Sequence, residues 1–189
     1  DYALLIATDA YDHFEDLTNP INDATTIQSI LTQKYGFQTE ILVNPTNDEI
    51  LAKITDYNIR KFNPQDQLFV FVAGHGTFDT DLGEGYVVAT NSIPNDKGRA
   101  SYISHILLRE RLNNVKCEHI FLMMDVCFGG TIDPVLAKAR AQEDMDEAAD
   151  KQFLVKKLTR HTRKYLTSGS KEYVPDGAPG KHSPFAEKF

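Results

Sequence analysis

Residues 68–76 have the sequence Leu-Phe-Val-Phe-Val-Ala-Gly-His-Gly, six apolar residues followed by a histidine between two glycines. A short, unbroken apolar run of this kind predicts a β-strand that is buried on both faces. Similar runs occur at residues 2–7, 39–43 and 120–124, and a shorter one at 165–168. We expect the four longer runs to form a buried sheet and the fifth to form one more short strand.

Helical patterns separate these runs. Asn19 and Pro20 predict the start of a helix and Gly36 its end, because proline fits the first turn and glycine the left-handed position after the last. Thr46 and Glu49 predict a capping box at the start of the next helix. The side chains expected to face inward are Ile21, Ala24, Ile27, Leu31 and Tyr35 in the first helix, Ile50, Leu51, Ile54 and Tyr57 in the second, and Ile103, Ile106, Leu107 and Leu112 in a third over about residues 102–112. This alternation predicts an α/β fold with a mostly parallel central sheet and helices on both faces.

Composition excludes several classes of protein. The chain has 189 residues, 41% of them hydrophobic, and a formal net charge of −7, and its length predicts a single domain. Its apolar runs are far shorter than the roughly 18 residues that a membrane helix needs. The acidic charge argues against nucleic acid as a partner, since phosphate binding needs a basic face. The two cysteines lack zinc-type spacing and are too few for a disulfide framework, and the first residues lack a signal-peptide pattern, so we expect a cytoplasmic protein.

Two loops at predicted strand ends carry reactive side chains. Parallel sheets place their chemistry at the carboxyl ends of the strands, and His75 follows one buried strand while Cys127 follows the next. Glycines beside both residues let a substrate approach, and an imidazole activates a thiol by taking its proton. We predict a Cys–His pair, although two unrelated loop residues would fit the same positions. The remaining histidines are expected to be structural: His13, His105, His119, His161 and His182.

Five segments of the chain are similar, in order, to the motifs of a known family. They are the first strand at 2–7, Asn-Pro-Ile-Asn-Asp-Ala at 19–24, the histidine segment at 71–76, Met-Asp-Val-Cys-Phe-Gly-Gly at 124–130, and 166–169 together with 182–185. In these segments the chain resembles the caspase-like cysteine peptidases, particularly the bacterial caspase homologues and the metacaspases. The caspase histidine lies about 50 residues before the cysteine, and the separation here is 52 residues. The resemblance implies a three-layer caspase-like sandwich.

The resemblance also implies catalytic roles. Cys127 would attack the scissile carbonyl as a thiolate, and His75 would protonate the leaving amine and then activate water. The backbone N–H groups of Gly76 and Cys127 would hold the oxyanion. The resemblance therefore implies a cysteine endopeptidase that forms a thioester intermediate and needs no third catalytic residue.

Substrate preference follows from charge. Asp125 stands two residues before the cysteine, as in metacaspases, which also use the aspartate that corresponds to Asp23. Two carboxylates in one pocket favour a basic residue before the cut, Arg ahead of Lys, and repel Asp. Glu172 and Asp176, in the C-terminal loop, are further candidates for this substrate-binding pocket.

The same resemblance divides the domain. Residues 1–133 correspond to a large subunit, 134–164 to a linker, and 165–189 to the start of a small subunit that is expected to continue in a longer protein. Residues 151–164 hold six Lys or Arg. An enzyme that cuts after basic residues is therefore expected to clip itself in this segment.

Other functions fit parts of the sequence. A catalytically silent caspase-like module for binding or scaffolding needs neither His75 nor Cys127, an Asp-specific peptidase needs a basic pocket, and a flavodoxin-like nucleotide-binding domain needs a phosphate loop that is missing here. No cofactor is expected. Calcium is an alternative, since many metacaspases need it, but the acids considered for it do not form an EF-hand loop: Asp79, Asp81, Glu84 and Asp133. The expected partners are a protein or peptide substrate and other domains of a longer chain, with no nucleic acid and no membrane.

Overall fold

A five-stranded, all-parallel sheet forms the middle layer of the protein. The computed structural model describes residues 1–127, 132, 161–169 and 174–189. In spatial order the strands are β2 (Gln38–Val43), β1 (Tyr2–Ala7), β3 (Gln67–Ala73), β7 (His119–Asp125) and β8 (Thr162–Thr167). The predicted strands are confirmed, although β8 begins and ends earlier than the predicted 165–168. The burial predicted for residues 39–43 is wrong, because β2 lies at the edge of the sheet and none of its residues is fully buried.

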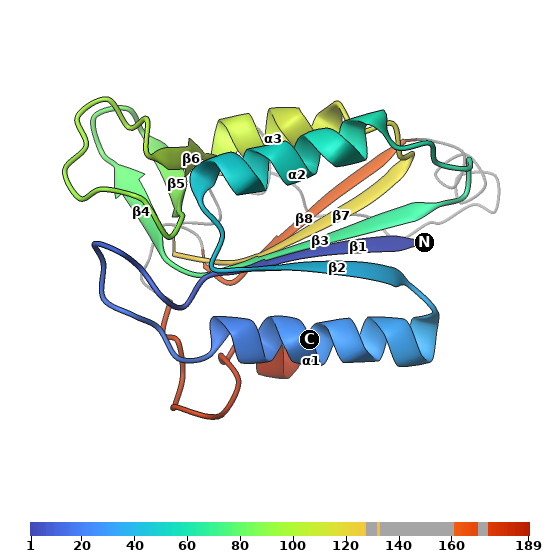
Figure 1. The fold of residues 1–189 in the computed structure, drawn as a ribbon, viewed down its shortest axis with the longest axis horizontal. Coiled ribbons are helices and arrows are strands. Elements are labelled where there is room, and N and C mark those ends of the chain that lie inside the picture. The colour runs from blue at the N-terminus through green and yellow to red at the C-terminus, as the bar shows by residue number, and fades with distance from the viewer. Residues whose placement is uncertain (128–131, 133–160, 170–173) are drawn as a thin grey trace, which may run out of the picture.

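Helices cover both faces of this sheet (Figure 1). α1 (Pro20–Tyr35) lies on one face, and α2 (Asn47–Ile59) and α3 (His105–Asn113) lie on the other. The three inner strands, β1, β3 and β7, are mostly apolar because alternate side chains enter opposite layers of the core. In β1, for example, Leu4 packs in the cluster that contains α2 and α3 residues, whereas Leu5 packs in the cluster of α1. The fold is the predicted three-layer α/β sandwich, and no described helix is both long and apolar enough to cross a membrane.

The helix starts follow local sequence signals in one case and tertiary contacts in another. The capping box of α2 is confirmed: the Thr46 hydroxyl accepts a hydrogen bond from Glu49 N–H at 3.3 Å, and the Glu49 carboxylate accepts one from Thr46 N–H at 2.8 Å. Asn19 begins α1 without a side-chain cap, because its amide binds the C-terminal loop instead. The inward position predicted for Tyr35 is wrong, since this last-turn side chain is 67% exposed.

A second, antiparallel sheet was not predicted. It consists of β4 (Gly76–Asp79), β5 (Glu84–Val88) and β6 (Tyr102–Ser104), and it continues from the loop that carries His75. The helix expected over 102–112 is therefore wrong at its start: residues 102–104 pair with β5, and the Ser104 hydroxyl accepts from Leu107 N–H at 3.0 Å to cap α3. This shift turns Ile106 outward, and Leu108 is buried in its place.

The register of the central sheet brings the functional loops to one edge. Ala7 pairs with Ala73, and Ala73 pairs with Asp125, so β1, β3 and β7 end at one level. His75 and Cys127 each lie two residues beyond these strand ends. The sheet therefore places the two loops side by side, as the sequence predicted.

Replacing Thr46 by Ala removes the capping hydroxyl of α2 and is expected to lower the free energy of unfolding by about 1 kcal/mol. Thr46→Ser keeps a hydroxyl at the same position and is expected to stay close to wild type. Urea denaturation followed by circular dichroism compares the three proteins. Equal stability of the Ala and Ser variants would contradict the cap.

Candidate active site

Two contacts fix the imidazole ring of His75. Its ring Nε2 lies 2.8 Å from the carbonyl oxygen of Glu15, and its imidazole packs against Tyr11 with ring centroids 4.8 Å apart. A carbonyl oxygen only accepts hydrogen bonds, so Nε2 is the nitrogen that donates. We assign the neutral ring its proton at Nε2, which leaves Nδ1 as the nitrogen able to accept a proton.

Cys127 is only 8% exposed, and the C-terminal part of the chain covers its thiol. Val174 N–H donates to Cys127 Sγ at 3.3 Å. From the other side the loop after β3 approaches very closely: a Cβ on Gly76 would overlap the carbonyl oxygen of Cys127 and lie 3.1 Å from its nitrogen. Only glycine at position 76 allows the two loops to meet in this way.

The backbone N–H of Gly76 is directed away from its strand partner. His75 C=O accepts from Val88 N–H at 3.0 Å, and antiparallel ladders alternate between hydrogen-bonded and non-hydrogen-bonded pairs. The next pair, Gly76 opposite Val87, is therefore of the second kind. Its N–H points out of the ladder on the residue that touches Cys127, which suits the predicted role as an oxyanion donor.

One small cavity joins the predicted residues. Its volume is ≈ 30 Å³, and its lining includes His75, Cys127, Asp23, Asp125 and Asp176. No Lys or Arg is found among the described residues that line it. Glu172, the remaining candidate for the pocket, lies outside the described residues. The structure thus brings the thiol, the imidazole and three carboxylates together, while their chemical roles stay predictions.

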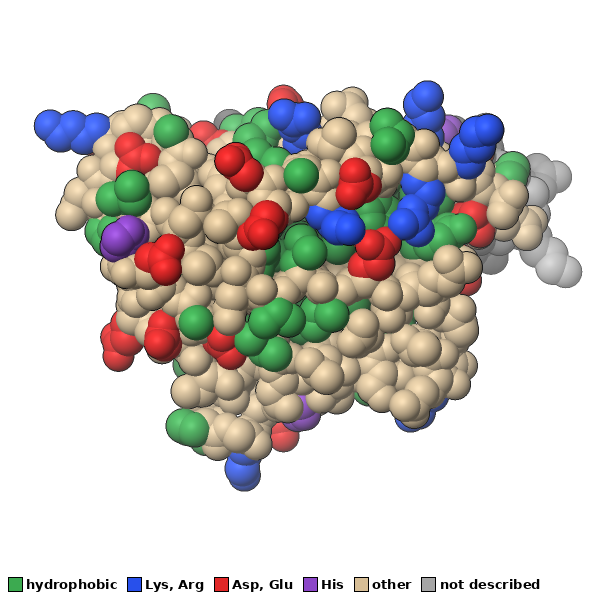
Figure 2. Space-filling model, viewed as in Figure 1, with side chains coloured by type: hydrophobic (Ala, Val, Ile, Leu, Met, Phe, Trp, Pro, Cys, Tyr) green, Lys and Arg blue, Asp and Glu red, His purple; other side chains and the backbone are tan. Residues whose placement is uncertain are grey.

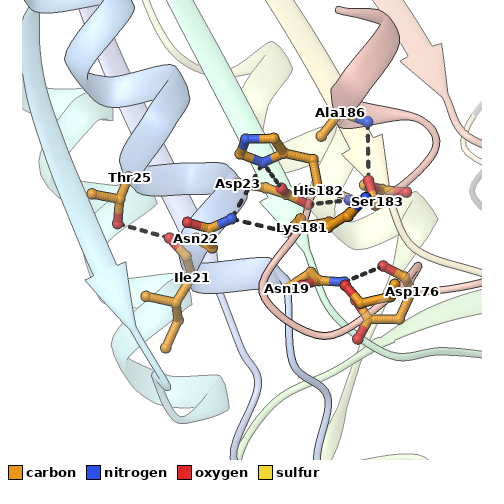
Figure 3. A network of polar contacts seen from close by, with 12 residues as sticks. Asn19, Ile21, Asn22, Asp23, Thr25, Asp176, Lys181, His182, Ser183 and Ala186 are labelled. Atoms are coloured by element: carbon orange, nitrogen blue, oxygen red, sulfur yellow. Dashed lines mark hydrogen bonds and ion pairs between the residues drawn. The ribbon is translucent and has the colours of Figure 1, made fainter.

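The C-terminal loop makes hydrogen bonds to the carboxylate of Asp23 (Figure 3), and its own Asp176 is bound in turn by the segment before α1. Asp23, in the first turn of α1, is 1% exposed, and its oxygens contact His182 Nδ1 at 2.5 Å and Ser183 N–H at 3.1 Å. The carboxylate of Asp176 accepts from Thr18 N–H at 2.8 Å and from the Thr18 hydroxyl at 2.9 Å. These contacts bind the loop to the start of α1.

Asp125 is the carboxylate with the least favourable surroundings. Burial raises its pKa above the ordinary value, and the nearby charges of Asp23 and Asp176 raise it further. The hydrogen bond from the Ser183 hydroxyl opposes this rise by stabilising the charged form. An ionised Asp125 therefore lies in a site that favours a cation, and the described lining of the cavity supplies none.

Sequence reasoning missed several of the residues that shape this site. His182 was expected to have only a structural role, yet it binds the pocket aspartate Asp23, and Ser183 binds both pocket aspartates. The similarity of 182–185 to a family segment was the signal that could have placed them there. Tyr11 and Thr18 carry no such signal, because their contacts depend on the course of the loop between β1 and α1.

Two other expectations, self-cleavage and metal binding, can be compared with the described residues only. Most of the segment predicted to be self-cleaved, residues 151–160, lies outside the described residues, and Arg163 and Lys164 belong to β8. Within the described part of the chain, no group of three His, Cys, Asp or Glu side chains is close enough to hold a metal ion.

Comparison with known proteins identifies the family. The family model of the caspase domain matches residues 1–188. The chain belongs to the caspase-domain family. It is 28% identical over 148 residues to metacaspase-1B of Aspergillus niger, an alignment that covers 68% of this chain and 33% of that protein. The chain thus spans about a third of the length of this curated relative.

The fold is shared with solved structures as well. Protein GSU0716 from Geobacter sulfurreducens superimposes with a TM-score of 0.66 over 99% of this chain and 79% of that one, at 15% sequence identity. At such low identity the similarity concerns the fold alone. For this caspase-domain chain it confirms the predicted α/β architecture.

Gly76→Ala is expected to lower the free energy of unfolding by about 1–3 kcal/mol, because the new methyl group meets the backbone of Cys127 rather than a movable side chain. Gly98→Ala is the matched control, since a Cβ there meets only Asp96 Oδ1 at 3.6 Å. Urea denaturation of both variants measures the difference. A Gly76→Ala protein as stable as Gly98→Ala would refute the close contact between the loops.

Proposed function

We propose that this caspase-domain protein is a cysteine endopeptidase that cleaves protein substrates after Arg, and less readily after Lys, with Cys127 as the nucleophile and His75 as the general acid and base. One observation carries the proposal: the cavity that joins the thiol and the imidazole is lined by three carboxylates and, among its described residues, by no Lys or Arg. Membership of the caspase-domain family supports the peptidase chemistry.

The proposed reaction begins with transfer of the thiol proton to His75 Nδ1. The hydrogen bond from Nε2–H to the Glu15 carbonyl stabilises the imidazolium that forms. The thiolate of Cys127 attacks the scissile carbonyl carbon, and the N–H groups of Gly76 and Cys127 stabilise the oxyanion, a contribution of about 3 kcal/mol for one such donor. The imidazolium then protonates the leaving amine nitrogen as the C–N bond breaks and a thioester remains.

Hydrolysis of the thioester completes the cycle. His75 removes a proton from a water molecule, whose oxygen attacks the thioester carbonyl. The C–S bond breaks, the thiolate of Cys127 leaves, and the carboxylic acid product is released. The same side chain thus serves as acid in the first half and as base in the second.

Charge supports the choice of a basic residue before the cut. A guanidinium meets carboxylates bidentately, and its charge would stabilise Asp125 in the ionised form that its surroundings disfavour. An Asp side chain would add a further negative charge to the same cavity. On the face in Figure 2, acidic side chains gather at the left, the end of the molecule at which the central strands terminate, which helps to attract a cationic peptide.

The cavity must open before a substrate binds. A volume of ≈ 30 Å³ has room for only about two water molecules and not for an Arg side chain. Val174 lies over the Cys127 thiol, and Ser183 occupies the hydrogen-bonding oxygens of Asp23 and Asp125. We therefore include displacement of the C-terminal loop as the first step of substrate binding.

Fluorogenic peptides that end in Arg, Lys or Asp test this function directly. We expect cleavage after Arg and Lys, none after Asp, and complete loss in Cys127→Ala. Cys117→Ala is the matched control, because Cys117 is fully buried just before β7, at the opposite end of this strand from Cys127, and does not line the cavity. Cleavage only after Asp would overturn the assigned specificity.

Asp125→Asn is expected to lower kcat/KM for Arg peptides at least tenfold, since loss of one partner of a buried ion pair costs about 2 kcal/mol or more. The same change should stabilise the fold at neutral pH. Because the pKa of Asp125 is raised in the folded state, its stabilising effect is present at low pH and lost as the pH rises through that pKa. Thermal unfolding midpoints should therefore favour Asp125→Asn increasingly as the pH rises, and an advantage that grows toward acid would contradict the raised pKa.

A catalytically silent binding module is the second candidate. The buried thiol and its cover by Val174 favour it. Such a module would cleave none of the three peptides and would be unaffected by Cys127→Ala in any binding assay. Activity that disappears with Cys127 excludes it.

A further inference from the structure

The hydrogen-bond ladder between β1 and β3 is interrupted at its last rung, next to His75. Thr8 N–H donates to Ala73 C=O at 3.0 Å, which is the regular parallel pattern. With Ala7 paired to Ala73, the next rung of a regular ladder would run from His75 N–H to Thr8 C=O. The Tyr11 hydroxyl occupies this rung instead: it accepts from His75 N–H at 2.8 Å and donates to Thr8 C=O at 2.9 Å.

The surroundings of the hydroxyl are built to hold it there. Tyr11 is 9% exposed, and burial keeps its pKa far above the ordinary value, so the group always has a proton to donate. A Cβ on Gly74 would lie 2.7 Å from the hydroxyl oxygen, and glycine at that position leaves the space open. Asp16 accepts from the backbone N–H of Tyr11 at 2.9 Å and fixes the loop from which the side chain extends.

We propose that Tyr11 is a positioning residue for His75. The Tyr11 hydroxyl lies between β1 and β3 at the last position of their hydrogen-bond ladder, keeps the two backbones apart there and so sets where His75 leaves the sheet. The loop between β1 and α1 then holds both ends of this residue, the backbone N–H through Tyr11 and the ring Nε2 through the Glu15 carbonyl. With these two points fixed, the direction of Nδ1 is fixed as well. The role rests on the proposed function, because it matters only if His75 and Cys127 exchange a proton.

Loss of the hydroxyl should shift the histidine without unfolding the protein. In Tyr11→Phe the ring still packs against the imidazole, but His75 N–H is free to close the rung directly onto Thr8. A displacement of about 1 Å at a reacting group lowers rates on the order of a hundredfold. We expect kcat for Arg peptides to fall about 10- to 100-fold with KM changed less than about twofold, since the carboxylates of the pocket are untouched.

Tyr102→Phe is the matched control. Tyr102 belongs to the same buried aromatic cluster, and its hydroxyl donates to Ile93 C=O at 2.7 Å without any contact to His75. Tyr102→Phe loses one hydrogen bond, and Tyr11→Phe loses two but regains one when His75 N–H bonds directly to Thr8 C=O, so the two variants should show similar thermal unfolding midpoints. Only Tyr11→Phe should lose kcat.

Alkylation of Cys127 by iodoacetamide gives a readout that needs no substrate. Its rate as a function of pH, followed by mass spectrometry of the Cys127 peptide, reports the fraction of thiolate. If His75 takes the thiol proton, wild type and Tyr102→Phe should react at lower pH than His75→Ala, and the profile of Tyr11→Phe should move toward that of His75→Ala.

The outcomes separate the two claims. A wild-type profile identical to that of His75→Ala would refute the Cys–His pair, and with it both the proposed function and the role of Tyr11. If wild type shows the Cys127–His75 pair and Tyr11→Phe changes neither kcat nor the pH profile of alkylation, the role of Tyr11 alone is overturned. Equal losses of kcat in Tyr11→Phe and Tyr102→Phe would show a merely structural effect and would also overturn it.

Discussion

The close contact of Gly76 with the backbone of Cys127 is the constraint on which the site depends. It joins the loops after β3 and β7, and it exists because the parallel register ends these strands at one level. No side chain fits between the two loops, so the peptide planes that carry the predicted oxyanion donors are set by backbone contact alone. The imidazole of His75 and the three carboxylates line the same cavity as Cys127.

The electrostatics of the site oppose the stability of the closed fold. Three carboxylates line a cavity whose described residues include no Lys or Arg, and the buried Asp125 has two other carboxylates, those of Asp23 and Asp176, nearby. The C-terminal loop reduces this cost by donating hydrogen bonds from Ser183 and by placing His182 on Asp23. In the proposed function this loop would hold the substrate site shut, because Ser183 and His182 bind carboxylate oxygens that a guanidinium would otherwise contact.

Much of this fold could be predicted from the sequence, and the reasons are local. β1, β3 and β7 are unbroken apolar runs because helices cover them on both faces, and the Thr46 capping box involves only neighbouring residues. The antiparallel sheet escaped prediction because β6 has three residues and its pattern continues into α3 without a break. His75 and Cys127 were predicted from their positions just after buried strands, and Asp23 and Asp125 from family motifs. Tyr11 was not predicted, because a hydroxyl inserted between two strands leaves no periodic or spaced pattern. The contacts of His182 likewise join residues 159 positions apart.

The central claim is that a thiol activated by His75 faces a pocket selective for basic side chains. A peptidyl chloromethyl ketone that ends in Arg tests both halves at once, because it must bind in the pocket before it alkylates the nucleophile. Mass spectrometry of the intact protein and of its peptides should find one label, on Cys127, with the Arg reagent and almost none with the matched Asp reagent. Equal labelling by the two reagents, or a label on any other residue, would contradict the account.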